Sequence, residues 1–151
     1  MGMKIIFCDV DGVLNSAYYT AKDGGGICAV EKRKVDNLKK IIDATGASVV
    51  ICSRAHSWSK SLNELRMNDI INFGVTPFAS ITDIEYQESK ALAIQRWMRK
   101  NNYENVNFVV FDDCASDLAM RFGERFIHIK TKHGLTSAYV KKAIEILNRG
   151  E

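Results

Sequence analysis

Residues 4–15 read KIIFCDVDGVLN, and this stretch decides the fold. Its first part, Lys4 to Cys8, is a short apolar run that stops abruptly at Asp9. A short β-rich run with no polar alternation is typical of a strand buried on both faces of a parallel sheet. Two further runs have the same form, SVVIC at Ser48 to Cys52 and NFVVF at Asn107 to Phe111. The three runs predict three central strands.

Helical patterns lie between these runs. Apolar residues recur at helical spacing within residues 35–42, 91–98 and 139–147. Weaker strands are predicted at Ile70 to Val75 and at Arg125 to Ile129. Strands that alternate with helices predict a three-layer, Rossmann-like α/β fold, with a central, mostly parallel sheet and helices on both faces.

The bulk properties favour one folded domain over residues 1–151. Hydrophobic residues make up 46% and charged residues 26%, a balance typical of globular proteins and not of disordered ones. The net charge of +3 is mild, with basic clusters only at Glu31 to Lys34 and Lys130 to Lys132. This excludes a strongly basic nucleic-acid platform but allows a weaker attraction for anionic substrates.

The cysteines and the N-terminal sequence predict a cytoplasmic location. Cys8, Cys28, Cys52 and Cys114 show neither the CxxC spacing of a zinc site nor the density of a disulfide scaffold. The apolar run before Asp9 is too short for a signal peptide or a membrane span, so we expect no membrane partner.

Polar residues follow each of the three predicted central strands. In a doubly wound sheet, ligands bind beyond the carboxyl ends of the strands. The residues at these ends are Asp9, Asp11, Ser53, Arg54, Asp112 and Asp113, with Asp117 four residues further on. Carboxylates gathered at one edge repel each other unless a cation neutralises them, and oxygen ligands without a His or Cys pair favour Mg²⁺ over zinc. Lys90, at the start of the helix that begins near Ser89, would balance further negative charge.

These motifs resemble those of a known family. Residues 9–15 (DVDGVLN) resemble the DxDGxL/T signature of the haloacid dehalogenase (HAD) superfamily, and its hydroxyl, basic and acidic motifs follow in order at Ser53, Lys90 and Asp112-Asp113 with Asp117. The segments Ser89 to Met98, Phe108 to Asp113 and His128 to Thr136 also resemble the small HAD domains found alone or attached to RNA-repair proteins. That group tends to have a tight Ser-Trp-Arg cluster where residues 53–58 read SRAHSW here, so the substrate class stays open.

The resemblance implies roles for the two aspartates of the first motif. Asp9 would attack phosphorus, form an aspartyl-phosphate and bind Mg²⁺ through its other oxygen. Asp11 would protonate the leaving oxygen and then deprotonate the hydrolytic water, while its backbone carbonyl completes a metal position. An acid at this position implies a phosphatase or phosphotransferase, since dehalogenase members lack it.

The resemblance also implies roles for the later motifs. Ser53 would bind a phosphoryl oxygen, and Lys90 would offset the charge of phosphate and nucleophile. Asp112 and Asp113 would hold the metal, with the direct ligand left open. Outside the motif residues, Arg54 is a candidate phosphate contact. Asp117 either orients Lys90 or the metal ligands, or caps the next helix.

The gaps between the motifs are too short for a cap domain. We therefore expect a capless or minimally capped site with residues 16–28 as a flap. An open site would admit a nucleotide, a sugar phosphate or a nucleic-acid end.

Two alternative functions remain. One is a non-catalytic module that binds phosphate or nucleic-acid ends. The other is a receiver-like phospho-acceptor domain, against which the order of the motifs argues. His128 and His133 are expected to be surface or packed side chains.

Overall fold

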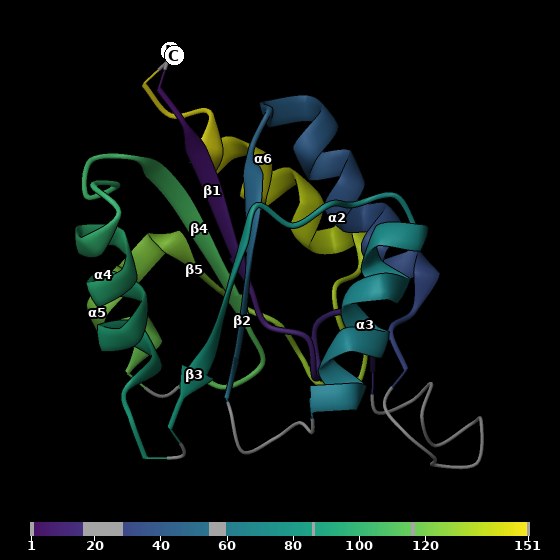
Figure 1. Ribbon diagram of the computed structural model, residues 1–151. Helices are drawn as coiled ribbons and strands as arrows, with labels where there is room; N and C mark the ends of the chain where they lie inside the picture. The colour runs from purple at the N-terminus through teal and green to yellow at the C-terminus, as the bar shows by residue number, and fades with distance from the viewer. Residues whose placement is uncertain (1, 17–28, 55–59, 86, 116, 151) are drawn as a thin grey trace.

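The protein is built on a sheet of five parallel strands in the order β3-β2-β1-β4-β5 (Figure 1). The computed structural model describes residues 2–16, 29–54, 60–85, 87–115 and 117–150. The strands are β1 (Lys4–Cys8), β2 (Ser48–Arg54), β3 (Ala79–Ile84), β4 (Asn107–Asp112) and β5 (Phe126–His128).

Helices cover both faces of this sheet. They are α2 (Lys32–Thr45), α3 (Lys60–Asn72), α4 (Lys90–Lys100), α5 (Leu118–Phe122) and α6 (Val140–Leu147), with short 3₁₀ turns η2 (Gly123–Arg125) and η3 (Ser137–Tyr139). In Figure 1, α2, α3 and α6 lie on one side of the sheet and α4 and α5 on the other. The three-layer α/β prediction is confirmed.

Each face of the sheet has its own apolar core. In β1, Ile6 and Cys8 pack on the side of α2 and α6, whereas Ile5 and Phe7 pack on the side of α4. Successive side chains of a strand point to opposite faces. Because both faces are covered, every residue of β1 is buried, which explains why this strand shows no polar alternation in the sequence.

The strand order places a topological switch point between β1 and β4. The chain builds β2 and β3 on one side of β1 and then returns to its other side to build β4 and β5. Cys8 pairs in register with Phe111, and the Asp9 N–H donates to the Phe111 carbonyl at 3.0 Å. Asp9 and Asp112 therefore lie beside each other where such sheets bind their ligands.

One strand prediction is wrong. Ile70 belongs to the last turns of α3, and the strand lies further on, as β3. Gly74 has a φ of +110° and turns the chain after the helix, while Ile70 and Val75 are buried in the core on the α2 side. A short apolar run at a helix end and one in a strand look alike in sequence, because the core demands the same residue types from both. The other four predicted strands are confirmed, with shifts of one or two residues at their ends.

Between β2 and α4, the described residues form α3 and β3 and no further helix or strand. Most of the predicted flap, residues 17–28, lies outside the described residues, as do Cys28, His56, Trp58 and the side chain of Arg54. No helix in the described part of the chain has the length and apolar character needed to cross a bilayer.

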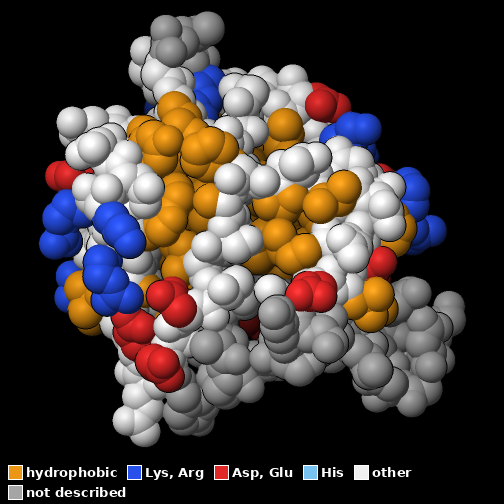
Figure 2. Space-filling model, in the orientation of Figure 1, with side chains coloured by type: hydrophobic (Ala, Val, Ile, Leu, Met, Phe, Trp, Pro, Cys, Tyr) orange, Lys and Arg blue, Asp and Glu red, His pale blue; other side chains and the backbone are white. Residues whose placement is uncertain are grey.

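Large apolar side chains are exposed on the described surface at Leu65, Ile71, Phe78, Leu92 and Met120. Figure 2 shows apolar atoms over much of the face on the side of the edge strand β3. Acidic side chains lie along the lower border of that face, toward the carboxyl ends of the strands.

Candidate active site

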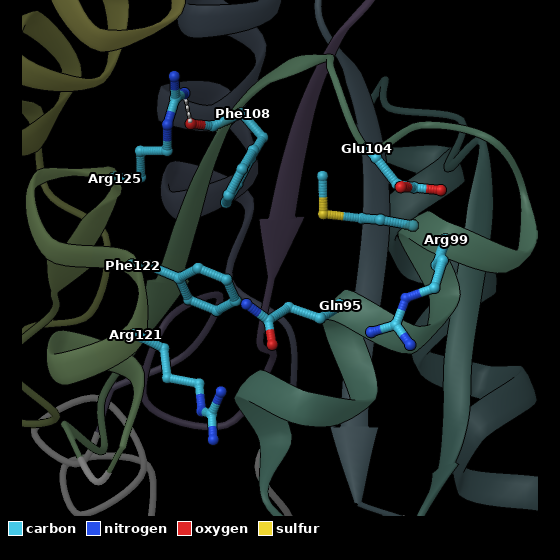
Figure 3. Close-up of a pocket in the computed structure, with 8 residues that line it drawn as sticks. Gln95, Arg99, Glu104, Phe108, Arg121, Phe122 and Arg125 are labelled. Carbon is cyan, nitrogen blue, oxygen red and sulfur yellow. Dashed lines mark hydrogen bonds between the residues drawn. The ribbon is translucent and has the colours of Figure 1, made fainter.

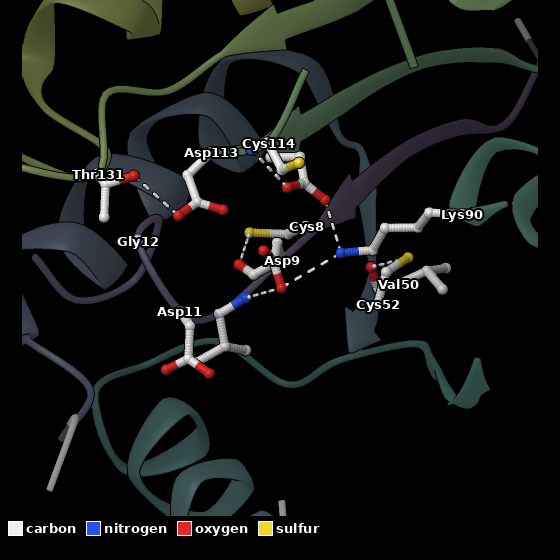
Figure 4. A network of polar contacts seen from close by, with 12 residues as sticks. Cys8, Asp9, Asp11, Gly12, Val50, Cys52, Lys90, Asp113, Cys114 and Thr131 are labelled. Carbon is white, nitrogen blue, oxygen red and sulfur yellow. Dashed lines mark hydrogen bonds and ion pairs between the residues drawn. The ribbon is translucent and has the colours of Figure 1, made fainter. Parts of the chain in front are cut away.

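Three carboxylates meet at the switch point. Carboxylate oxygens of Asp9, Asp112 and Asp113 lie within 4.8 Å of one another (Figure 4). Asp9 directly follows β1, Asp112 ends β4 and Asp113 follows it. The sequence prediction that these side chains share one edge is therefore met by the geometry.

Lys90 lies among these carboxylates and is only 6% exposed. Its Nζ donates to Asp112 Oδ2 at 2.6 Å and lies 3.3 Å from Asp9 Oδ1. Burial alone would lower the pKa of Lys90, but the negative charges of Asp9 and Asp112 outweigh it and raise the pKa above its ordinary value. Lys90 is therefore a fixed positive charge at the site.

The start of α4 holds Lys90 in place. Ser89 is the N-cap of this helix, and its Oγ accepts a hydrogen bond from the Leu92 N–H at 3.1 Å. The same hydroxyl donates to Asp117 Oδ2. Asp117 precedes α5 without capping it through its side chain, so the capping alternative is not what the structure shows. Instead, Asp117 contacts the residue next to Lys90.

The carboxyl group of Asp9 is buried and electrostatically crowded. Its Oδ1 accepts a hydrogen bond from the Val10 N–H at 2.9 Å. The pKa of Asp9 is raised to about 8: burial is the largest cause and Asp112 and Asp113 add to it, while Lys90 and the Val10 N–H oppose the increase. Burial also raises the pKa of Asp113, against the effect of a hydrogen bond from Thr131. Without a further cation, this site resists full ionisation.

The donor set fits a hard divalent cation. Asp9, Asp112 and Asp113 would carry three negative charges if ionised, against one positive charge on Lys90. All three offer oxygen, the donor that Mg²⁺ prefers. Gly12, with a φ of +80°, permits this crowding, because a Cβ atom there would lie 2.2 Å from Asp113 Oδ2. The close approach of the first and last motifs therefore requires glycine at this position.

Asp11 is paired with an arginine that the sequence analysis did not single out. Arg66 in α3 is 3% exposed, and its Nη2 lies 2.9 Å from Asp11 Oδ1. Asn15 Nδ2 donates to the same oxygen at 3.3 Å, and Asn15 Oδ1 accepts from the Gly12 N–H at 2.9 Å. Arg66 lies one helical turn before the buried Ile70, on the inward face of α3, a position that only the folded helix reveals.

Asp113 is held from the chain after β5. Thr131 Oγ1 donates to Asp113 Oδ2 at 2.9 Å, and His128 Nε2 is hydrogen-bonded to the Asp113 carbonyl at 2.9 Å. His128 is exposed, as the sequence predicts, but its ring also contacts the site backbone. Nothing in the sequence around Thr131 indicates its contact with Asp113, because Thr131 reaches Asp113 only through the parallel pairing of β4 and β5.

Cys8 and Cys52 lie beside the carboxylates as buried thiols. Burial raises the pKa of both, with Asp9 adding to the effect, and that of Cys52 reaches about 12. Thiols with such values stay protonated at neutral pH and are poor nucleophiles. These two cysteines therefore act as small core residues next to the site.

The second motif is placed by β2. Cys8 pairs in register with Ile51, so Ser53 lies two residues beyond that pair, at the same edge of the sheet. Ser53 is 3% exposed. Arg54 ends β2, and its side chain is outside the described residues.

Comparison with known proteins gives the family. No curated protein sequence matches this chain. Residues 5–140 match the family model described as the HAD domain in Swiss Army Knife RNA repair proteins. Apart from Lys4, the first residue of β1, the match includes all five strands of the sheet and all the residues assigned above to the site. The chain therefore belongs to this family of HAD domains.

Proposed function

We propose that this protein is a Mg²⁺-dependent phosphomonoester hydrolase that acts through an aspartyl-phosphate intermediate. The observation that carries the proposal is the position of Asp9 beside Lys90 and two further carboxylates at the switch point. Membership of the HAD family supports phosphatase-type chemistry. The mechanism, the metal and the site residues are part of the proposal, as is a single catalytic domain over residues 1–151.

Asp9 is the nucleophile in this proposal. Its Oδ1 faces the Val10 N–H and Lys90, which leaves Oδ2 to attack phosphorus. An Oδ2–P bond forms while the bond from phosphorus to the leaving oxygen breaks. Water then attacks phosphorus, the Oδ2–P bond breaks, and Asp9 and inorganic phosphate are released.

Asp11 transfers the protons of both steps. It gives a proton to the leaving oxygen and takes one from the attacking water. Arg66 and Asn15 hold its carboxylate within the turn that follows β1. Asp11 is about half exposed, so its side chain is open to substrate and water.

Four carboxylate residues would hold the metal: Asp9, Asp112 and Asp113 through side chains, and Asp11 through its backbone carbonyl. When bound, Mg²⁺ supplies the positive charge that these carboxylates and a phosphoryl oxygen need. Asp112 Oδ2 binds Lys90 and its Oδ1 accepts the Cys114 N–H at 2.9 Å. We therefore infer that Asp113 is the more direct ligand and that Asp112 mainly fixes Lys90.

The remaining residues bind and orient phosphate. Ser53 and Arg54 contact phosphoryl oxygens from the end of β2, and Lys90 offsets the charge of phosphate and Asp9. Asp117 keeps Lys90 in position through Ser89.

The proposed substrates are phosphate groups on nucleotides or nucleic-acid ends. The family description, which refers to RNA repair, supports nucleic-acid ends over sugar phosphates. The short connections around α3 and β3 are consistent with an open site that admits a strand. A cytoplasmic location is part of this proposal.

The test is phosphate release from p-nitrophenyl phosphate, nucleotides, sugar phosphates and 3′- or 5′-phosphorylated oligonucleotides, with Mg²⁺ or EDTA. We expect turnover that requires Mg²⁺, that Asp9→Asn abolishes, and that Asp43→Asn, at an exposed aspartate of α2, leaves intact. Binding of phosphorylated ends without turnover of any substrate would instead identify a non-catalytic binding module.

A further inference from the structure

The two basic clusters of the sequence meet in one cavity. Residues 31–34 and residues 130–132 are almost 100 positions apart, yet members of both line the same cavity of about 580 Å³. The lining residues are Ser16, Val30, Glu31, Lys32, Arg33, Lys34, Phe73, Lys132, His133 and Thr136. The mild net charge of the whole chain therefore hides a local concentration of positive charge.

Backbone contacts bring these clusters together. The Leu135 N–H donates to the Val13 carbonyl at 2.8 Å, which ties the chain after β5 to the turn after β1. Gly134 packs closely there, since a Cβ atom on it would lie 2.8 Å from the Asn15 carbonyl oxygen and 3.2 Å from Lys34 Cε. The cavity is thus formed by fixed main-chain contacts between segments distant in sequence.

Two residues of the cavity lining are next in sequence to residues that contact the site carboxylates. Ser16 follows Asn15, which donates to Asp11. Lys132 follows Thr131, which donates to Asp113. A chain-like ligand with its end at Asp9 therefore has a positively charged surface next to it.

The chemistry of the lining favours a chain of phosphates. Lys32 is paired with Asp36 at 3.0 Å. The other charged lining residues are Arg33, Lys34 and Lys132, which are positive, and Glu31, which is negative, so positive charge still predominates. The cavity also lies at the N-terminal, positive end of α2, whose N-cap, Glu31, makes no side-chain capping bond. Only one aromatic residue, Phe73, is among the described lining residues, so base stacking is not the main attraction. Spread positive charge with little aromatic surface is suited to the sugar-phosphate backbone.

We propose that this cavity binds the phosphodiester backbone of a nucleic-acid strand whose terminal phosphate lies at Asp9. The use of the bound strand as a substrate rests on the function proposed above. The binding itself does not, because the cavity holds internal phosphodiesters and not the reacting group. The substrate class is then strand ends in preference to mononucleotides.

A second cavity supplies a matched control. It measures about 480 Å³ and is lined by Arg99, Arg121 and Arg125 between α4 and α5. Figure 3 shows Arg99 and Arg121 on either side of Gln95. Phe108, which also lines it, is four residues before Asp112 along β4, about 13 Å away. It has similar charge and size but does not adjoin the carboxylates.

The experiment compares Arg33→Gln/Lys132→Gln with Arg99→Gln/Arg121→Gln, each of which removes two exposed positive charges. Fluorescence anisotropy measures binding of a labelled single-stranded 12-mer RNA with hydroxyl ends, in the Asp9→Asn background, over a range of salt concentrations. A second assay measures the ratio of kcat/KM for a phosphorylated 12-mer to that for p-nitrophenyl phosphate.

For Arg33→Gln/Lys132→Gln we expect roughly three- to tenfold weaker binding and a similar fall in the kcat/KM ratio. The slope of log K against log salt should become shallower by about 1.4, since each lost phosphate contact on a single strand removes about 0.7. The Arg99/Arg121 variant should retain wild-type values. Equal losses in both variants, or no binding of the hydroxyl-ended strand at low salt, would overturn the proposal. Turnover of p-nitrophenyl phosphate by the wild type reports separately on the function itself.

Discussion

At the scale of single residues, the environment of Asp9 links its ionisation to the stability of the metal-free protein. The folded pKa of about 8 lies above the ordinary value of 3.8. Between these two pH values the folded state binds more protons than the unfolded state, so stability falls as pH rises. Burial and the neighbouring carboxylates are the cause, and both act only in the folded protein.

The first prediction follows from this decrease of stability with rising pH. In EDTA, the Tm of the wild type should fall as pH rises from 4 toward 8, and Asp9→Asn should melt higher than the wild type at pH 8, by on the order of 5 °C. Thermal melts of both proteins at pH 5 and pH 8 check this. Asp43→Asn, which changes an exposed carboxylate, should follow the wild type. An Asp9→Asn protein that melts below the wild type at pH 8 would show that ionised Asp9 does not destabilise the metal-free folded protein.

The second prediction concerns Arg66 and Asp11. In Arg66→Met, Asp11 loses the guanidinium at 2.9 Å that fixes its carboxylate, so proton transfer should slow and kcat should fall roughly tenfold, with little change in KM. An alkoxide is a poor leaving group and depends on protonation by Asp11, whereas p-nitrophenolate leaves readily without it. The loss should therefore be larger for an alkyl phosphate, such as a nucleotide, than for p-nitrophenyl phosphate. Equal slowing of both substrates would mean that Arg66 does not act through Asp11.

The sequence predicts the site residues unequally at this scale. Asp9, Asp112 and Lys90 can be found because they lie at strand ends or a helix start. Arg66 and Thr131 could not be found in this way, because their partners lie 55 and 18 residues away and only tertiary packing joins them.

At the scale of elements, the start of α4 joins helix stability to the geometry of the candidate site. Ser89 caps the helix and contacts Asp117, while Lys90, the next residue, contacts Asp9 and Asp112. A change at Ser89 is therefore expected to shift Lys90 in the site.

The third prediction uses this link. Ser89→Ala removes the cap and the contact with Asp117, and should lower the free energy of unfolding by about 1 kcal/mol. It should also reduce kcat, because Lys90 loses its fixed position, whereas Ser89→Thr keeps a hydroxyl and should retain most of both properties. Urea titrations and phosphate-release kinetics check the two effects. Stability lost without any loss of kcat would mean that the cap does not position Lys90.

The elements differ in how well the sequence predicts them. β1, β2 and β4 are central strands buried on both faces, so their apolar runs stand out. β3 is an edge strand in which only Ile81 and Ile84 are buried, so its apolar pattern is weaker than that of the end of α3. The sequence therefore predicts the strand at residues 70–75, where the apolar residues at the end of α3 form the stronger pattern.

At the scale of the whole molecule, the strand order turns separate motifs into one site. Asp9 and Asp113 come from strands that are neighbours in the sheet but about 100 residues apart in sequence. Parallel pairing in register brings their carboxylates within 4.8 Å, and Gly12 allows that approach. The sequence predicts which ends of the strands meet, because the carboxyl ends of parallel strands share an edge. It does not predict the basic cavity, which depends on the contact between the turn after β1 and the chain after β5.

The fourth prediction tests whether the three carboxylates, brought together only by folding, bind Mg²⁺. A cation that binds only where the carboxylates meet stabilises the folded state, by about 2.7 kcal/mol at a concentration one hundred times its Kd. Mg²⁺ should therefore raise the Tm of the wild type, and more at pH 8 than at pH 5, because protons compete for Asp9 and Asp113, whose pKa values are raised. Asp113→Asn should lose most of this increase. Asp117→Asn should keep it, because Asp117 contacts Ser89 and lies outside the carboxylate group. Equal increases in all three proteins would mean that Mg²⁺ binds elsewhere on the protein, and would remove the metal site from the mechanism.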